Sequence, residues 1–197
     1  WTKWFKILKS ECMNIGVISR RYARALYTFA GEQQQSKTVY KHMKRLGKNF
    51  YRLPELRKAI ENPVLDVEKK VELLKTAAQC NDDSEKVLEQ FFRLVLAQKR
   101  EKFLQFMIWS YIGLYRRENN ILMGRLTTAV PSPVLEKRMT TIIEGKTSKE
   151  VEFHTSVDPN IIGGYVLEMA GYRIDASISS QLKRVKNQFV SKNRRIV

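Results

Sequence analysis

Few residues of this chain have the type and spacing needed for chemistry. Gly145-Lys146-Thr147 imitates the end of a phosphate-binding loop, in which backbone amides and a lysine hold the phosphates of a nucleotide. That loop needs an earlier glycine at the position where this chain has Thr140, and it joins a strand to a helix, whereas this triplet follows a predicted helix. We therefore expect no nucleotide site here.

The histidines and acidic residues offer no better catalytic or metal site. His42 and His154 are the only histidines, and neither has a carboxylate or thiol at a pairing distance along the chain, so we interpret both as surface or core-edge residues. Asp82, Asp83 and Glu85 suit the start of a helix, where carboxylates meet the positive end of the helix dipole. The sequence predicts no enzyme, no cofactor and no metal ion.

Glycine and cysteine positions point to structure as well. Gly163-Gly164 lacks the GxGxxG spacing of a dinucleotide-binding turn and precedes a predicted strand, which favours a backbone position with unusual dihedral angles. Cys12 and Cys80 lie far apart and form no CxxC pair, so neither a disulfide framework nor a zinc site is indicated. A reducing compartment is the default interpretation.

Net charge is the unusual property of the composition. The 197 residues carry 36 Lys+Arg against 20 Asp+Glu, a net charge of +16, with 43% hydrophobic residues. The hydrophobic content predicts a folded chain, and the charge suggests an acidic partner: nucleic acid, an anionic membrane surface or an acidic protein. The basic residues are dispersed over predicted helix faces and accompany no nucleic-acid-binding motif. A basic helical nucleic-acid-binding or adaptor protein is the alternative hypothesis.

The predicted helices and strands, which must position any site, divide the chain into two parts between residues 120 and 121. Before this point the apolar spacing is helical almost throughout. After it, strand patterns alternate with helices. We predict two domains: an all-α six-helix bundle over residues 13–120 and a small α+β domain over residues 121–197. The predicted helix starts of the bundle are Ser19, Ser36, Pro54, Asp66, the run 81–85 and Glu101.

The second domain is predicted from shorter patterns. We expect strands over 121–130 and 151–157, a helix over 134–144 and a hairpin at Ala170-Gly171. Ser177 can cap a final helix. The predicted inner face of that helix consists of Ile178, Leu182, Val185 and Phe189.

Residues 1–12 stand apart from both domains. They place Trp1, Trp4, Phe5 and Leu8 on one helical face, as a membrane-surface or partner-binding helix would. Met13 directly precedes the predicted bundle, so we interpret residues 1–12 as an extension upstream of a native start. No segment has the ~18–20 continuous apolar residues of a membrane-spanning helix.

Several local patterns, in this order, resemble the delta subunit family of F-type ATP synthases, which includes the mitochondrial oligomycin-sensitivity-conferring protein. The segment 21–27 is similar to the family's opening motif. Two later family motifs are similar to Asn62-Pro63 and to the stretch 91–100. The most specific match is the segment 157–164. The positions that match family motifs are Tyr22, Ala23, Leu26, Pro63, Asp158, Gly163, Gly164, Gly171, Asp175 and Ser177.

This resemblance implies a stator subunit of the peripheral stalk without chemistry of its own. In the family, the helical domain receives the amino-terminal helices of the alpha subunits in the alpha/beta catalytic head, and the carboxy-terminal domain binds the b subunits. Association with the membrane is then indirect, through the complex, and nucleic acid is not a partner. The chain shows no Arg- and Ser-rich leader, so we expect the cytoplasmic face of a bacterial inner membrane rather than a mitochondrion or chloroplast.

The resemblance also suggests where the alpha helix binds. An amphipathic helix binds by placing apolar anchors between two helices of its partner. We expect this groove between the first helix and the helix over 84–98. The candidate partner-binding residues are Tyr22, Ala25, Phe29, Leu88, Phe92 and Val95. For each of them, a place in the core of the bundle is the competing interpretation.

Overall fold

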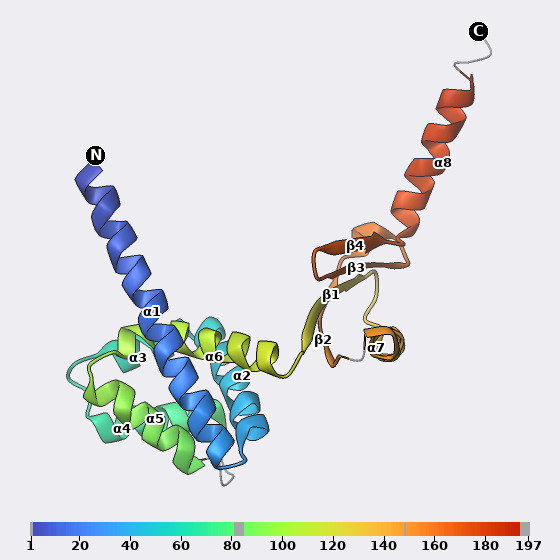
Figure 1. Ribbon diagram of the computed structural model, residues 1–197. Coiled ribbons are helices and arrows are strands. Elements are labelled where there is room, and N and C mark those ends of the chain that lie inside the picture. The colour runs from blue at the N-terminus through green and yellow to red at the C-terminus, as the bar shows by residue number, and fades with distance from the viewer. Residues whose placement is uncertain (1, 81–84, 148, 194–197) are drawn as a thin grey trace. The chain divides into compact units, whose positions relative to one another are not determined.

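The computed structural model describes residues 2–80, 85–147 and 149–193 (Figure 1). The chain divides into two compact units, Trp1–Glu118 and Asn119–Val197. The first unit is helical and the second combines helices with a four-stranded sheet. The predicted order of a helical part followed by a small α+β part is thus confirmed.

Local sequence explains most helix boundaries of the helical unit. Pro54 occupies the first turn of its helix, where its missing N–H costs nothing, and extended Asn62 ends that helix before Pro63. Gln79 ends the next helix in the left-handed conformation (φ 54°). The elements are α1 (Thr2–Glu32), α2 (Ser36–Arg52), α3 (Pro54–Glu61), α4 (Val67–Ala78), α5 (Glu85–Ala97), the 3₁₀ turn η1 (Glu101–Phe103) and α6 (Leu104–Glu118).

Two predicted caps are wrong. Helix α1 begins at Thr2, so Ser19 lies in its middle and is only 1% exposed. The helix continues because residues 12–19 contain no proline and only one glycine to interrupt it. Ser36 is the first residue of α2, and Gln35 stands at the N-cap position without a side-chain capping hydrogen bond. Figure 1 shows that the first turns of α1 extend beyond the other helices of the unit.

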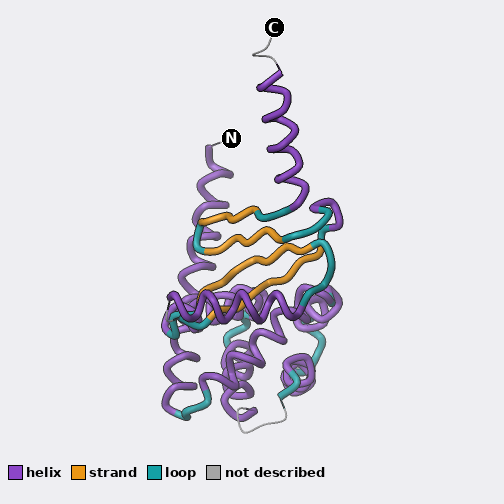
Figure 2. Tube along the Cα trace, turned by 90° about the vertical axis from the view of Figure 1, so that its right-hand side faces the viewer, coloured by secondary structure: helices purple, strands orange, loops and turns teal. Residues whose placement is uncertain are grey.

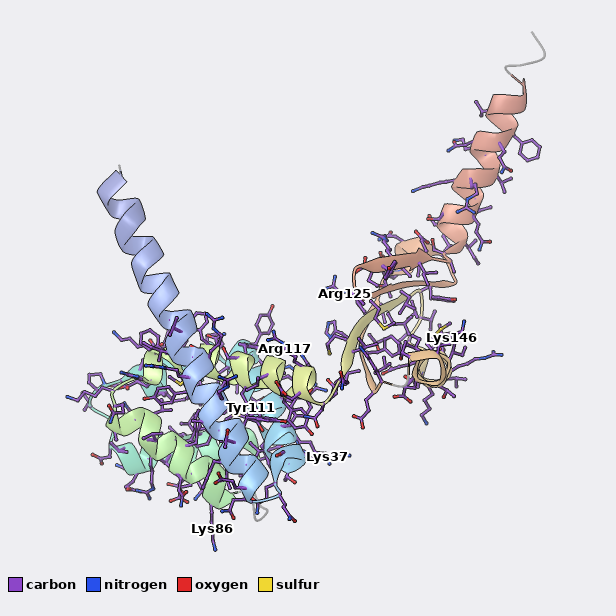
Figure 3. All side chains as sticks on the ribbon, viewed as in Figure 1. Lys37, Lys86, Tyr111, Arg117, Arg125 and Lys146 are labelled. Carbon is purple, nitrogen blue, oxygen red and sulfur yellow. The ribbon has the colours of Figure 1, made fainter. Side chains whose placement is uncertain are left out.

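Helix α6 forms the centre of the helical unit, where it packs against α1 and α2. Tyr111 on α6 is fully buried between the helices (Figure 3), and this burial raises the pKa of its phenol. The rings of Tyr40 and Tyr115 stack with centroids 4.2 Å apart. The apolar residues Leu53 and Val67 are exposed, because each stands at the end of its helix.

The α+β unit is a single sheet with one covered face. Its strand order is β2-β1-β3-β4, with β1 parallel to β2 and the other neighbours antiparallel (Figure 2). Helix α7 packs on β2, and Leu126, Ile143 and Leu167 form the small core. The elements are β1 (Leu122–Thr128), α7 (Pro133–Thr147), β2 (Val151–Val157), the 3₁₀ turn η2 (Pro159–Ile161), β3 (Tyr165–Met169), β4 (Tyr172–Asp175) and α8 (Ile178–Asn193).

The last helix differs most from expectation. Helix α8 starts beside η2 and projects away from the sheet (Figure 1). The prediction that the apolar stripe of α8 forms an inner face is therefore wrong: the helix leaves the sheet (Figure 1), and the small core is formed by β1, β3 and α7 instead. The stripe residues Ile178, Leu182, Val185 and Phe189 are between 43% and 65% exposed.

Candidate partner-binding sites

The segment 163–177 forms the base from which α8 projects. The amide of Ile178, the first residue of α8, donates to the carbonyl oxygen of Gly163 (3.0 Å), and the amide of Ala176 donates to that of Tyr165 (2.9 Å). Gly164 has φ +76°, and a side chain there would overlap the carbonyl oxygen of Ala176. The glycine pair thus lets two backbone segments approach closely at the start of the helix.

Asp175 and Ser177 complete this base. The carboxylate of Asp175 accepts hydrogen bonds from the Ser177 amide (3.0 Å), the Ser177 hydroxyl (2.6 Å) and the Ser180 hydroxyl (2.9 Å). These bonds lower the pKa of Asp175 to about 2, so they are lost only when the pH falls to that range. Ser177 Oγ in turn accepts from the Ser180 amide (3.3 Å), which confirms it as the cap of α8.

The remaining family positions lie elsewhere. Asp158 caps η2 by accepting from the amide of Asn160 (3.0 Å), and Gly171 (φ +84°) forms the hairpin between β3 and β4. Pro63 follows α3. Ala23 and Leu26 are buried on α1. The structure therefore brings Gly163, Gly164, Asp175 and Ser177 together and leaves the others with separate local roles.

The candidate residues on α1 share one flank of that helix, where Tyr22 contacts Arg100, a residue that follows α5. Tyr22 lies under the guanidinium of Arg100 (5.5 Å from ring centroid to Cζ), which also donates to its hydroxyl (3.3 Å). Successive helical residues are 100° apart, so Tyr22, Ala25 and Phe29 share one side of the buried stripe. Tyr22 and Phe29 are half-buried, and Ala25 is exposed. These three side chains remain partly accessible.

The candidate residues on α5 are placed differently. Leu88, Phe92 and Val95 are all 0% exposed, so the competing core interpretation describes them. Their side chains fill the interior of the bundle and leave no area for a partner. On the same helix, Leu94 is 50% exposed. Sequence reasoning did not single out Leu94 as an accessible apolar side chain, because it lies at the edge of a wide apolar face.

The described residues contain little that could do chemistry. Among them, no group of three or more His, Cys, Asp or Glu side chains could hold a metal ion. None of the described helices contains an apolar stretch of the length that a bilayer requires. His154 is exposed, whereas His42 is buried in the bundle and donates from Nδ1 to the Ala78 carbonyl (3.0 Å). Lys146 stands in the last turn of α7 (Figure 3). The acidic side chains at 82, 83 and 85 lie outside the described side chains.

Comparison with known proteins places the chain in a family. Residues 18–189 match the family model described as ATP synthase delta (OSCP) subunit. The chain is 49% identical over 186 residues to the ATP synthase subunit delta of Phocaeicola vulgatus, covering 94% of this chain and 100% of that protein. It is 41% identical over the same length to that of Bacteroides thetaiotaomicron, with the same coverage.

A solved structure agrees in fold. A chain of the cryo-EM structure of the Toxoplasma gondii mitochondrial ATP synthase hexamer superposes with a TM-score of 0.59 and 18% identity, covering 87% of this chain and 97% of that chain. Because the family model and both bacterial relatives span nearly the whole sequence, this chain belongs to the ATP synthase delta (OSCP) subunit family.

Proposed function

We propose that the protein joins the catalytic head of a bacterial ATP synthase to the b subunits through a separate surface on each unit. As a member of its family, it is a non-catalytic stator subunit of the peripheral stalk. A stator must hold the head against the torque of the rotor, which requires two independent attachments. The observation that carries the proposal is the apolar stripe of α8, in which Leu182, Val185 and Phe189 are between 46% and 65% exposed.

The helical unit is assigned to the head. We place the amino-terminal helix of an alpha subunit along the seam between α1 and α5, defined by Tyr22, Ala25, Phe29 and Leu94. The three α1 residues flank the buried stripe on one side, and Leu94 lies on the α5 edge away from α4, since Glu89 and Arg93 on the other edge pair with Lys75 and Glu68 of α4. Accessible apolar side chains on two neighbouring helices suit a helix-in-groove contact.

Substitution of Leu94 by aspartate tests this seam. We expect Leu94→Asp to weaken binding of a synthetic alpha-subunit amino-terminal helix by about tenfold, because a charge would replace an apolar anchor. The measurement is fluorescence anisotropy with the labelled peptide. Leu73→Asp on α4, with a similarly exposed leucine (39%), is the control and should bind normally. Equal weakening by both variants would contradict the seam.

The α+β unit is assigned to the b subunits through α8. The base formed by residues 163–177 fixes where α8 begins, and its stripe repeats at the helical spacing that suits packing against another helix. Contact with amphipathic b helices would remove the exposed side chains of Leu182, Val185 and Phe189 from water, each worth about 1.5–3 kcal/mol when fully buried. Apolar burial would therefore supply most of this attachment.

A charge in the stripe should break the attachment. We expect Val185→Asp to reduce capture of the soluble part of the b subunit at least tenfold without changing the melting temperature, because Val185 is already 46% exposed. Asn187→Asp adds the same charge on the opposite side of α8 and serves as the control. Capture of b by Val185→Asp at the level of the unmodified chain would refute the role of α8.

The proposed cellular location of the protein is that of the ATP synthase complex. The family is one of subunits peripherally associated with a membrane-bound complex, and we place this protein on the cytoplasmic face of the bacterial inner membrane. Purification of the tagged chain from detergent-solubilised membranes should recover alpha, beta and b subunits together. Recovery with nucleic acid alone would contradict the proposal and support the alternative of a basic nucleic-acid-binding protein.

A further inference from the structure

A second surface of α1 carries a different chemistry from the seam with α5. On its other flank, α1 and α6 border a groove of about 540 Å³. Four arginines line it: Arg20, Arg21 and Arg24 from α1 and Arg117 from the end of α6. Figure 3 labels Arg117. No carboxylate belongs to the described residues that line the groove. The groove therefore concentrates positive charge.

The guanidinium groups of this groove are available to a partner. Among the described parts of the chain, no acidic side chain forms an ion pair with Arg21, Arg24 or Arg117, and Arg20 donates from Nε to the Gly16 carbonyl of its own helix (3.1 Å). Arginines elsewhere in the chain, such as Arg57 and Arg93, are paired with glutamates. All four groove arginines are exposed.

Small and apolar residues line the groove together with the arginines. Ala23 and Ser110 lie along it, and a side chain added at Gly113 would meet nothing within 4 Å. Small residues on a groove floor allow a helix backbone to approach closely. Val17 and Leu114 add apolar surface at the edges. A phosphate backbone would use the arginines but would gain nothing from this apolar surface.

We infer that the α1–α6 groove binds an acidic amphipathic helix of a partner protein, whose carboxylates pair with the four arginines while its apolar side packs over Gly113. This inference goes beyond the proposed function, because it concerns the opposite flank of α1. Charge complementarity commits the groove to an acidic occupant, and its small-residue floor favours a helix over an anionic lipid or RNA. Helix α1 would then contact two partner segments, one on each side.

A designed peptide tests the groove directly. The probe is a fluorescent 18-residue helix with leucine and alanine along one side and glutamate elsewhere, titrated into the full chain. We expect a dissociation constant in roughly the micromolar range. Gly113→Leu should weaken binding at least about tenfold while leaving the melting temperature unchanged or raised, because it fills the groove and removes a helix-interior glycine. Normal binding by Gly113→Leu would overturn the inference.

Charge reversal supplies the second test. Arg24→Glu combined with Arg117→Glu should also weaken binding at least about tenfold. The matched control, Lys37→Glu combined with Lys86→Glu, makes the same change in net charge at two exposed lysines outside the groove (Figure 3) and should remain within about twofold. Equal losses in both pairs would show attraction by net charge alone and would overturn the inference.

Two further measurements separate this groove from other sites and ligands. Leu94→Asp should bind the acidic probe normally, so that a failure of the α1–α5 seam and a failure of the α1–α6 groove can be told apart. A peptide of the same composition with its leucines dispersed should bind at least about tenfold more weakly. If anionic phosphatidylglycerol vesicles or a polyadenylate RNA compete for the groove more strongly than the helical probe, the occupant is not an acidic helix and the inference fails.

Discussion

Phe92→Asp is expected to unfold the helical unit. Phe92 is 0% exposed and is one of the largest fully buried side chains. Removing a buried phenylalanine costs about 3–5 kcal/mol, and burying an unpaired carboxylate adds several more. The sum is comparable to the whole stability of a domain of this size. The helical signal in circular dichroism and the fluorescence of Trp109 should both show an unfolded helical unit at 25 °C.

Leu94→Asp is the matched control for this prediction. The two positions are on the same helix and receive the same charge, but Leu94 is half exposed. We expect it to change the free energy of unfolding by less than about 1 kcal/mol. A cooperatively folded Phe92→Asp variant that merely lost binding to the alpha-subunit helix would instead place Phe92 at the partner surface.

Gly164→Ala is expected to destabilise the α+β unit by about 3 kcal/mol or more. The left-handed conformation costs a residue with a side chain about 1–2 kcal/mol, and the added methyl group would overlap the carbonyl oxygen of Ala176. That carbonyl belongs to the backbone and cannot move without displacing the start of α8. The expected change includes weaker hydrogen bonding between Ala176 and Tyr165.

Hydrogen exchange is the suitable measurement for Gly164→Ala. The three tryptophans all lie within residues 1–118, so tryptophan fluorescence does not report on the α+β unit. Amide protection in β3 and at the start of α8 should fall by about two orders of magnitude. Gly171→Ala is the control, since Gly171 also has a positive φ but open space around it, and it should cost only about 1 kcal/mol. Equal costs at the two positions would show that the overlap is unimportant.

The sequence predicts where the helices and strands of this fold lie better than it predicts which of their apolar faces are buried within the chain. The apolar face that the helical spacing predicts for α5 is buried, at Val87, Leu88, Phe91, Phe92, Val95 and Leu96. Ser177 caps α8 because its hydroxyl suits that position. The same spacing marks Ile178, Leu182, Val185 and Phe189 as an inner face, yet they are exposed. Amphipathicity shows that a face will leave water but not whether its own chain or a partner will cover it.

The sites were harder to predict for a related reason. Phe92 and Leu94 are both apolar residues of one helix, and only the position of α1 and α4 around that helix decides which is buried. The beginning of α1 was missed because a capping serine is a local signal, and an uninterrupted helical sequence before Ser19 overrides it. Which apolar residues are buried therefore depends on packing between helices that are distant in the sequence, and local patterns do not show this packing.

The projecting α8 has a consequence for the supply of this protein in the cell. A copy made in excess of its partners presents an apolar helix to water, which is the kind of surface that chaperones and proteases recognise and that drives aggregation. Production of the chain must therefore be matched to that of the rest of the complex, or the surplus must be removed. We expect the same surface to cause self-association when the protein is concentrated alone, and co-expression with the proposed b-subunit partner to improve its yield.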